Sequence, residues 1–272
     1  LGAVPFYFDS RNRRVTFVDS LRREKIRQID SIETFFRLNS DGLDISDSTA
    51  INEMSPDRQL LTKTLWIHRE KLRRCYKELT DYNNAFKPFE ICRDGFIFKL
   101  ESSERAVIHG YGLDLVFAKW PDFAKYLSGG WFEEFIYLQC KPYEDAGVIQ
   151  DLRINVKLNL KQENALGNSN WGVEYNELDI TFTDGYSLYI VECKAGNVTQ
   201  EQVMKLQNLV RFYGGTEGRG IVACCVPPNT ESAKKKIKDA RLTLWSGASL
   251  AEQIKTMMNS IAARAEAIEG TT

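Results

Sequence analysis

Three charged residues in the second half of the chain lie among apolar neighbours. Asp179 stands between a leucine and an isoleucine, and the apolar segment 188–191 leads directly into Glu192, two residues before Lys194. Side chains alternate between the two faces of a strand, so Glu192 and Lys194 should point to the same face. Carboxylates that face each other inside a sheet repel and lose hydration, and a bound divalent cation would remove both costs.

This arrangement would suit the hydrolysis of a phosphodiester bond. A hard cation such as Mg²⁺ or Mn²⁺ on Asp179 and Glu192 would polarise the phosphate and lower the pKa of a bound water. The main-chain carbonyl of Cys193 could add an oxygen ligand, and Lys194 could orient the water or stabilise charge in the transition state. The alternative is a surface ion pair between Glu192 and Lys194, because short motifs also occur by chance.

A predicted hairpin would bring these residues together. Three strands are expected in succession, at about residues 152–160, 173–183 and 188–193. A turn of four residues that begins at Asp184 would pair Thr183 with Leu188. In that register Asp179 lies directly opposite Glu192, and a turn of two residues would leave the same side chains on the same face.

Helices are expected to alternate with the strands in this half of the chain. A helix is predicted from about residue 130 to 140, and a second begins at a capping box formed by Thr199 and Gln202 and ends at Gly214-Gly215. The remaining elements are a buried strand at 221–226, a basic helix at 231–240 and a last strand at 242–245. This order predicts a mixed α/β sandwich.

The first 120 residues are organised differently. Residues 1–40 read as two short strands and a helix, too little to form a core alone. A long helix at 56–82 followed by strands at 95–100 and 105–108 resembles a winged-helix module. Winged helices often bind DNA but also act as spacers and dimerisation modules. We therefore predict three parts: residues 1–40, a linker domain at 41–120, and the α/β domain at 121–272.

The balance of charge says little about partners. The chain has 36 Lys and Arg residues against 37 Asp and Glu residues, so contact with nucleic acid would depend on local patches. The strongest patch is Lys234, Lys235 and Lys236, which could contact a nucleic-acid backbone or simply form a solvated helix face. Trp171 could stack on a base or cap the core, and Gln207 could contact the site or substrate.

Cysteine and histidine usage argues against a zinc site. The six cysteines form no C-x-x-C pair, and His68 and His109 are the only histidines. Reduced, buried thiols in a cytoplasmic protein are the simplest interpretation. No apolar stretch approaches the roughly 18 residues that a membrane span needs, so no membrane partner is expected.

Four segments of the chain resemble a known family of nucleases. They are Gly130-Trp131-Phe132-Glu133, Asn176-Glu177-Leu178-Asp179, Val191-Glu192-Cys193-Lys194, and Lys205-Leu206 with Gly214-Gly215. The spacing of the central pair is similar to the D…ExK signature of PD-(D/E)xK nucleases. The ordered set looks like the CARF-fused ancillary nucleases of type III CRISPR systems.

This resemblance implies a fold, a chemistry and roles for residues. The fold would be a restriction-endonuclease-like mixed sheet flanked by helices, after a small winged-helix-like linker. In that family a CARF domain binds a cyclic oligoadenylate, usually cyclic tetra-adenylate, and activates metal-dependent cleavage of RNA or DNA by a homodimer. By position, Asp179 and Glu192 would be metal ligands and Lys194 catalytic. Glu133 would be the helix glutamate that completes the site, although its neighbour Glu134 is a close alternative.

One departure from the family concerns the sensor. Only residues 1–40 could match the final hairpin and exit helix of a CARF domain, so we expect that this chain does not bind cyclic tetra-adenylate unaided. Two rival hypotheses remain. One is a housekeeping or restriction-type DNA nuclease, and the other is an inactive nuclease fold used for nucleic-acid binding or dimerisation. The intact Asp179, Glu192 and Lys194 favour an active enzyme.

Overall fold

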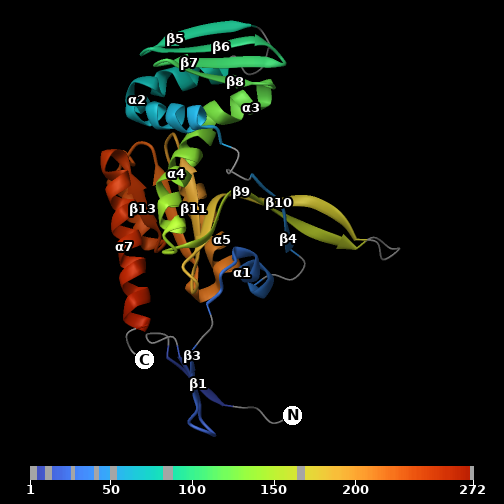
Figure 1. Cartoon of the computed structure of the whole chain (residues 1–272), viewed down its shortest axis with the longest axis vertical. Coiled ribbons are helices and arrows are strands. Elements are labelled where there is room, and N and C mark those ends of the chain that lie inside the picture. Colours follow the sequence, from blue (N-terminus) through green and yellow to red (C-terminus); the bar gives the residue numbers. More distant parts are fainter. Residues whose placement is uncertain are drawn as a thin grey trace.

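The computed structural model describes residues 5–9, 14–25, 28–39, 43–49, 54–81, 88–163 and 169–269. A six-stranded sheet forms the centre of the molecule, with the strand order β13-β12-β11-β10-β9-β4 (Figure 1). Its strands are β4 (Leu43–Thr49), β9 (Gln150–Glu163), β10 (Ser169–Thr183), β11 (Leu188–Lys194), β12 (Arg219–Cys224) and β13 (Thr243–Ser246). Pairing is antiparallel from β4 to β11 and parallel from β11 to β13, which confirms the predicted mixed sheet.

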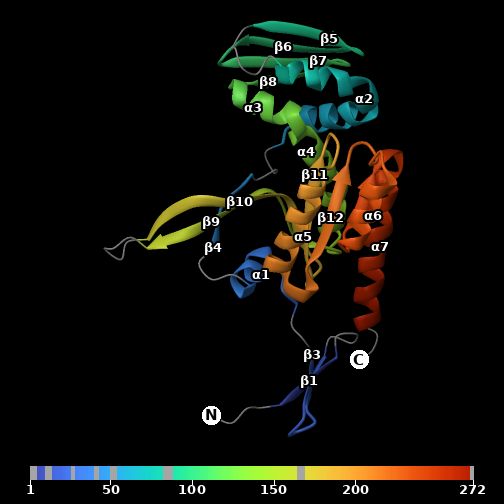
Figure 2. The same cartoon turned by 180° about the vertical axis from the view of Figure 1, so that it is seen from behind.

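Helices cover both faces of this sheet and enclose two hydrophobic cores (Figures 1 and 2). The first core takes apolar side chains from α4 (Trp131–Asp145) and α7 (Leu250–Glu269). The second takes them from α1 (Ile32–Asn39), α5 (Gln200–Gly214) and α6 (Glu231–Asp239). The sheet is therefore the middle layer of a sandwich, as the alternation of strands and helices predicted.

A second sheet lies beyond one end of the sandwich and packs on the long helix α2 (Pro56–Asp81) (Figure 1). Its four strands form an antiparallel meander of β5 (Phe89–Arg93), β6 (Phe96–Ser102), β7 (Arg105–Gly110) and β8 (Leu113–Phe117). The two strands predicted at 95–100 and 105–108 are thus the middle strands of a four-stranded sheet. Short α3 (Trp120–Lys125) and a π-helical turn (Tyr126–Gly130) connect it to α4.

The first residues of the chain divide between two structures. β1 (Phe6–Asp9), β2 (Arg14–Phe17) and β3 (Arg23–Lys25) form a small sheet of their own, which contains the predicted hairpin. α1, however, packs in the second core through Phe35 and Phe36, and β4 pairs with β9 as the edge of the large sheet. α1 and β4, which lie on either side of residue 40, therefore both belong to the sandwich.

Two elements of the sandwich were missed by the sequence prediction. β4 has the sequence Leu-Asp-Ile-Ser-Asp-Ser-Thr, whose aspartates and serines are poor strand formers, so its place depends on pairing with β9. α7 did carry a signal, since Leu250, Ile254, Met258 and Ile261 recur at helical spacing and are all buried.

The structure describes the side chains of five of the six cysteines. Cys140, Cys193, Cys224 and Cys225 are free and buried, whereas Cys92 is free but exposed. The side chain of Cys75 lies outside the described residues. Among the helices that the structure describes, none combines the length and apolar character that crossing a membrane requires.

Candidate active site

The hairpin of β10 and β11 has the register that a turn of residues 184–187 requires. Thr183 pairs with Leu188, and the pairing continues as far as Ile180 opposite Val191. At the next position the side chain of Asp179, and not its main chain, accepts the hydrogen bond from β11. Its Oδ2 accepts a hydrogen bond of 2.7 Å from the backbone N–H of Cys193. Asp179 is therefore tied to β11 at the point where the ladder ends.

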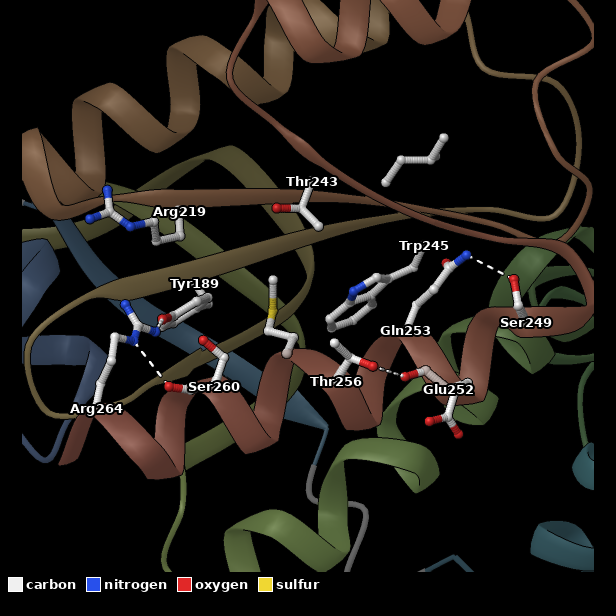
Figure 3. Close-up of a pocket in the computed structure, with 12 residues that line it drawn as sticks. Tyr189, Arg219, Thr243, Trp245, Ser249, Glu252, Gln253, Thr256, Ser260 and Arg264 are labelled. Carbon is white, nitrogen blue, oxygen red and sulfur yellow. Dashed lines mark hydrogen bonds between the residues drawn. The ribbon is translucent and has the colours of Figure 1, made fainter. Parts of the chain in front are cut away.

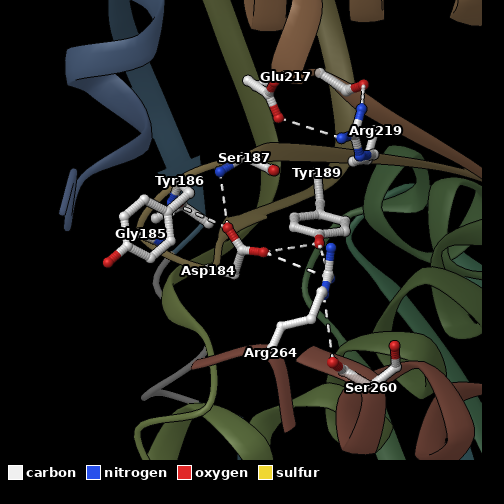
Figure 4. Close-up of polar contacts among 11 residues, drawn as sticks. Asp184, Gly185, Tyr186, Ser187, Tyr189, Glu217, Arg219, Ser260 and Arg264 are labelled. Carbon is white, nitrogen blue, oxygen red and sulfur yellow. Dashed lines mark hydrogen bonds and ion pairs between the residues drawn. The ribbon is translucent and has the colours of Figure 1, made fainter. Parts of the chain in front are cut away.

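A buried carboxylate fixes the length of the turn (Figure 4). The Oδ1 of Asp184 accepts hydrogen bonds from the backbone N–H groups of Tyr186 and Ser187, at 3.0 and 2.7 Å. Its Oδ2 accepts a hydrogen bond from the Tyr189 hydroxyl and lies 3.7 Å from the guanidinium of Arg264 on α7. These contacts hold a four-residue turn, and turn length sets the pairing of the strands.

The three charged residues singled out from the sequence meet at one point. The Nζ of Lys194 lies 2.6 Å from Oε1 of Glu192 and 4.0 Å from Oδ2 of Asp179. All three side chains are at least three-quarters buried. The surface ion pair considered as an alternative would be exposed, so the burial of this group argues against it.

A fourth charged group comes from the first turn of α4. Burial raises the pKa of Glu133 from 4.5 to about 8, and the nearby charge of Asp179 adds to the rise. The Oε2 of Glu133 is buried and has no hydrogen-bond partner among the described residues. The adjacent Glu134 contacts Arg58 and Thr62 instead. Of the two glutamates, Glu133 is therefore the one whose pKa responds to Asp179, whereas Glu134 is bonded to α2.

The electrostatics of the site are those of crowded, desolvated carboxylates. Burial raises the pKa of Asp179 from 3.8 to about 7, and repulsion by Glu192 contributes further. Burial acts to lower the pKa of Lys194, but the attraction of Asp179 and Glu192 more than offsets it and the net pKa is raised. A cationic side chain therefore lies where two anionic groups converge.

A divalent cation fits the donor chemistry of this site. The Glu133 carboxylate has a buried oxygen without a hydrogen-bond partner among the described residues, and burial and repulsion raise the pKa of Asp179. A divalent cation bound between these carboxylates would offset both the desolvation and the repulsion. Among the described residues no three acidic, cysteine or histidine side chains are grouped closely enough to hold a metal ion. The contacts explain this spacing, because the Lys194 ammonium lies on Glu192 and Asp179 is bonded to the Cys193 amide.

Other predicted site residues lie apart from this group or are only partly placed. The thiol of Cys193 is buried in the first core, so only its main-chain carbonyl remains a possible ligand. Gln207 donates to the carbonyl of Ala240 at 3.1 Å and so ties α5 to the end of α6; its contact with the site or the substrate stays a prediction. The side chain of Trp171 lies outside the described residues.

The three lysines predicted to contact nucleic acid are exposed on α6. Lys234 forms an ion pair of 2.8 Å with Glu231, and Lys236 hydrogen-bonds the side chain of Gln200. Gln200 is the first residue of α5, which begins six positions after Lys194 in sequence. α6 therefore reaches the part of α5 that follows the site, and its contact with nucleic acid stays a prediction.

Two further charged residues at the site were not found from the sequence. The Nζ of Lys125, at the end of α3, lies 2.9 Å from Oε1 of Glu177. The charges of Glu133 and Asp179 also act on Lys125, which shows that it faces the same acidic group. Glu177 could have been suspected, because it lies two residues from Asp179 on the same strand. Lys125 carries no such local signal.

The pocket shown in Figure 3 is a separate feature. It has a volume of about 560 Å³ and lies between α7 and the sheet. Tyr189, Arg219 and Thr243, at or near the starts of β11, β12 and β13, line it. Glu192 and Lys194 lie at the other end of β11, so this pocket is not part of the acidic site.

Comparison with known proteins agrees with the geometry. Residues 122–264 match the family model described as Card1-like, endonuclease domain. This range includes Glu133, Asp179, Glu192 and Lys194. Among curated protein sequences, none matches the chain.

Two solved structures share the fold. One is Can2 from Sulfobacillus thermosulfidooxidans in complex with cyclic tetra-adenylate, with a TM-score of 0.64, 16% identity, and coverage of 93% of this chain and 68% of that one. The other is protein VC1899 from Vibrio cholerae, with a TM-score of 0.67, 15% identity, and coverage of 95% and 69%. At these identities the likeness shows a common fold.

Proposed function

Because the chain belongs to the family of Card1-like endonuclease domains, we propose that it is a metal-dependent endonuclease that hydrolyses phosphodiester bonds in RNA, DNA or both. One observation carries the proposal. Within the family match, the Nζ of Lys194 lies 2.6 Å from Glu192 and 4.0 Å from Asp179, and the charge of Asp179 acts on Glu133 of α4. A module that only bound or dimerised would have no use for such a costly buried cluster.

The residues divide the chemistry between them. Asp179, Glu192 and the carbonyl of Cys193 would hold Mg²⁺ or Mn²⁺, and Glu133 would complete the acidic set. Such an ion supplies a Lewis acid for the phosphate and lowers the pKa of a bound water. The Lys194 ammonium pairs with Glu192, one of the carboxylates that would hold the ion. It would orient the attacking water or stabilise negative charge on the phosphate oxygens.

The biological setting is proposed from the family and the shared fold. The match to Card1-like endonuclease domains and the fold shared with Can2, which was solved with cyclic tetra-adenylate, support a role in CRISPR-linked antiviral defence. In longer relatives cyclic tetra-adenylate would be the activator. We propose that the protein acts as a cytoplasmic homodimer.

A cleavage assay tests the activity directly. Purified protein should cut single-stranded RNA, single-stranded DNA or supercoiled plasmid with Mg²⁺ or Mn²⁺, and EDTA should stop the reaction. Asp179→Ala and Glu192→Ala should each abolish cleavage and leave the circular dichroism spectrum unchanged, because each removes a carboxylate that would hold the cation. Glu104→Ala, at an exposed position between β6 and β7, is the matched control and should cut normally.

Two outcomes would count against this assignment. If either site variant cuts at the rate of the unmodified protein, the residues are wrongly assigned. If the unmodified protein binds nucleic acid but never cuts it, the alternative of an inactive nuclease fold used for binding is favoured.

A further inference from the structure

The position of Glu133 is not fixed by contacts of its own carboxylate. Its Oε2 has no hydrogen-bond partner in the described part of the chain. The helix that carries it, α4, starts directly after the π-helical turn, in which Gly129 departs from helical geometry with φ 168° and ψ −23°. No described side chain caps the start of α4. Some other contact must therefore set where the first turn of α4 lies.

That contact is made by Glu134, the next residue, with the long helix α2. The Nε of Arg58 lies 3.1 and 3.2 Å from the two carboxylate oxygens of Glu134, and its Nη2 lies 2.5 Å from Oε1. The hydroxyl of Thr62 donates a further hydrogen bond of 3.2 Å to Oε2. Glu134 is only 8% exposed and the Arg58 side chain is 34% exposed, so these are partly buried, charge-assisted contacts with a fixed planar geometry.

The surrounding side chains restrain Arg58 and Thr62 in these contacts with Glu134. The hydroxyl of Tyr126 lies 2.8 Å from that of Thr62, and the Arg58 guanidinium stacks 5.1 Å from the centre of the Tyr126 ring. Trp66, also on α2, stacks on the ring of Phe135 with centroids 4.4 Å apart. Successive residues of a helix point about 100° apart, so α2 can hold Glu134 while Glu133 faces the acidic site.

We propose that Arg58 is a positioning residue for the active site. It fixes the first turn of α4 through Glu134 and thereby sets the place of Glu133 beside Asp179. This inference rests on the proposed function. It also means that movement of α2, which packs under the second sheet, would be transmitted to the acidic site through the Arg58–Glu134 ion pair and the packing of Trp66 on Phe135.

A pair of variants separates positioning from stability. Arg58→Met alone leaves the Glu134 carboxylate buried without its cation, which should lower the melting temperature and activity together. The double variant Arg58→Met/Glu134→Gln removes both charges, and replacement of a whole buried pair by uncharged groups is commonly tolerated. Its melting temperature should therefore recover, but the first turn of α4 would no longer be held in place.

Two measurements should reveal the loss of position in the double variant. At saturating metal its kcat should stay at least ~10-fold below that of the unmodified protein with KM changed less than ~2-fold, since small misplacements of a reacting group have large effects on rate. Its Kd for Mn²⁺, measured by electron paramagnetic resonance without substrate, should be weakened about 3-fold or more because one carboxylate has lost its place.

The control is Lys71→Met. Lys71 is also on α2, and it forms an ion pair of 2.9 Å with Asp94 inside the linker region. This variant should change neither kcat nor Mn²⁺ affinity. If the double variant recovers kcat and Mn²⁺ affinity together with its melting temperature, Arg58 only stabilises the fold and the inference is overturned. If the unmodified protein neither cuts nor binds Mn²⁺, the proposed function has failed and the inference fails with it.

Discussion

At the scale of single residues, the site is defined by carboxylates that are difficult to ionise. The folded protein holds the pKa of Asp179 at about 7 and that of Glu133 at about 8, whereas their ordinary values are 3.8 and 4.5. Burial is the main cause in both cases. Groups with such raised pKa values are typical of sites where a bound ligand offsets the desolvation and repulsion, and a divalent cation would do so.

These shifts predict how stability depends on pH. Between about pH 4 and pH 8 the unfolded chain has released protons that the folded protein still holds, so the free energy of unfolding should fall as pH rises through that window. The loss should level off above pH 8. Urea unfolding in EDTA should show a decrease of about 6 kcal/mol from pH 5 to pH 8.5, the sum for two groups that titrate independently. Asp179→Asn should reduce the slope; stability that rises through the window would contradict the assignment.

A second prediction concerns Lys194, whose ammonium competes with a cation for Glu192. Lys194→Met should lower cleavage by about 100-fold, because it removes a group that orients water or stabilises the transition state. Mn²⁺ binding, however, should be kept or strengthened, because a positive charge has been taken away from two carboxylates. Titration of Mn²⁺ by electron paramagnetic resonance checks this. Loss of binding together with activity would show that Lys194 holds the carboxylates in place.

At the scale of elements, the β10–β11 hairpin matters most because its register places Asp179 against β11. That register depends on the turn, and the turn depends on one side chain, Asp184, which accepts two backbone hydrogen bonds and contacts Tyr189 and Arg264. A slip of one residue would move Glu192 to the opposite face of the sheet and dismantle the site.

Asp184→Ala should therefore be strongly destabilising. It leaves two turn N–H groups and a hydroxyl without their acceptor, which should cost about 2–3 kcal/mol in the free energy of unfolding. Urea denaturation provides the measurement, and Asp239→Ala, at an exposed position on α6, is a matched control that should change stability by less than about 0.5 kcal/mol. Equal effects of the two substitutions would show that the turn holds its shape without Asp184.

At the scale of the whole molecule, residues distant in sequence share the sandwich around the site. α1 lies more than a hundred residues before the strands that it covers, yet Phe36 is 1% exposed and meets Tyr213 of α5 edge to face. The segment from α1 to β4 is therefore not a separate appendage. Its helix completes the second core, and β4 covers an edge of the large sheet that would otherwise be open to pairing.

This packing predicts unequal effects along one short helix. Phe36→Ala should lower the free energy of unfolding of the sandwich by about 3–5 kcal/mol, because it opens a cavity in the core. Leu38→Ala, two residues later but 68% exposed, should have little effect. Thermal unfolding followed by tryptophan fluorescence and by residual nuclease activity would compare them. Equal stability of the two variants would mean that α1 does not belong to the core.

The sequence by itself was sufficient to predict the β10–β11 hairpin and its register. Alternation along a strand has a period of two and depends only on neighbouring residues, so the common location of Asp179, Glu192 and Lys194 could be predicted. The same holds for the capping box at Thr199, which the structure confirms. Such features are local, and local patterns can be read without knowledge of the fold.

Only the tertiary structure shows which residues the packing of helices on the sheet brings to the acidic site. Glu133 and Glu134 are adjacent and chemically identical, and only the contact with Arg58, 76 residues away, shows which one faces the site. Lys125 and Glu177 are 52 residues apart, and β4 pairs across more than a hundred. Helix orientation is set by the sum of packing contacts over a whole core, and no short stretch of sequence contains that sum.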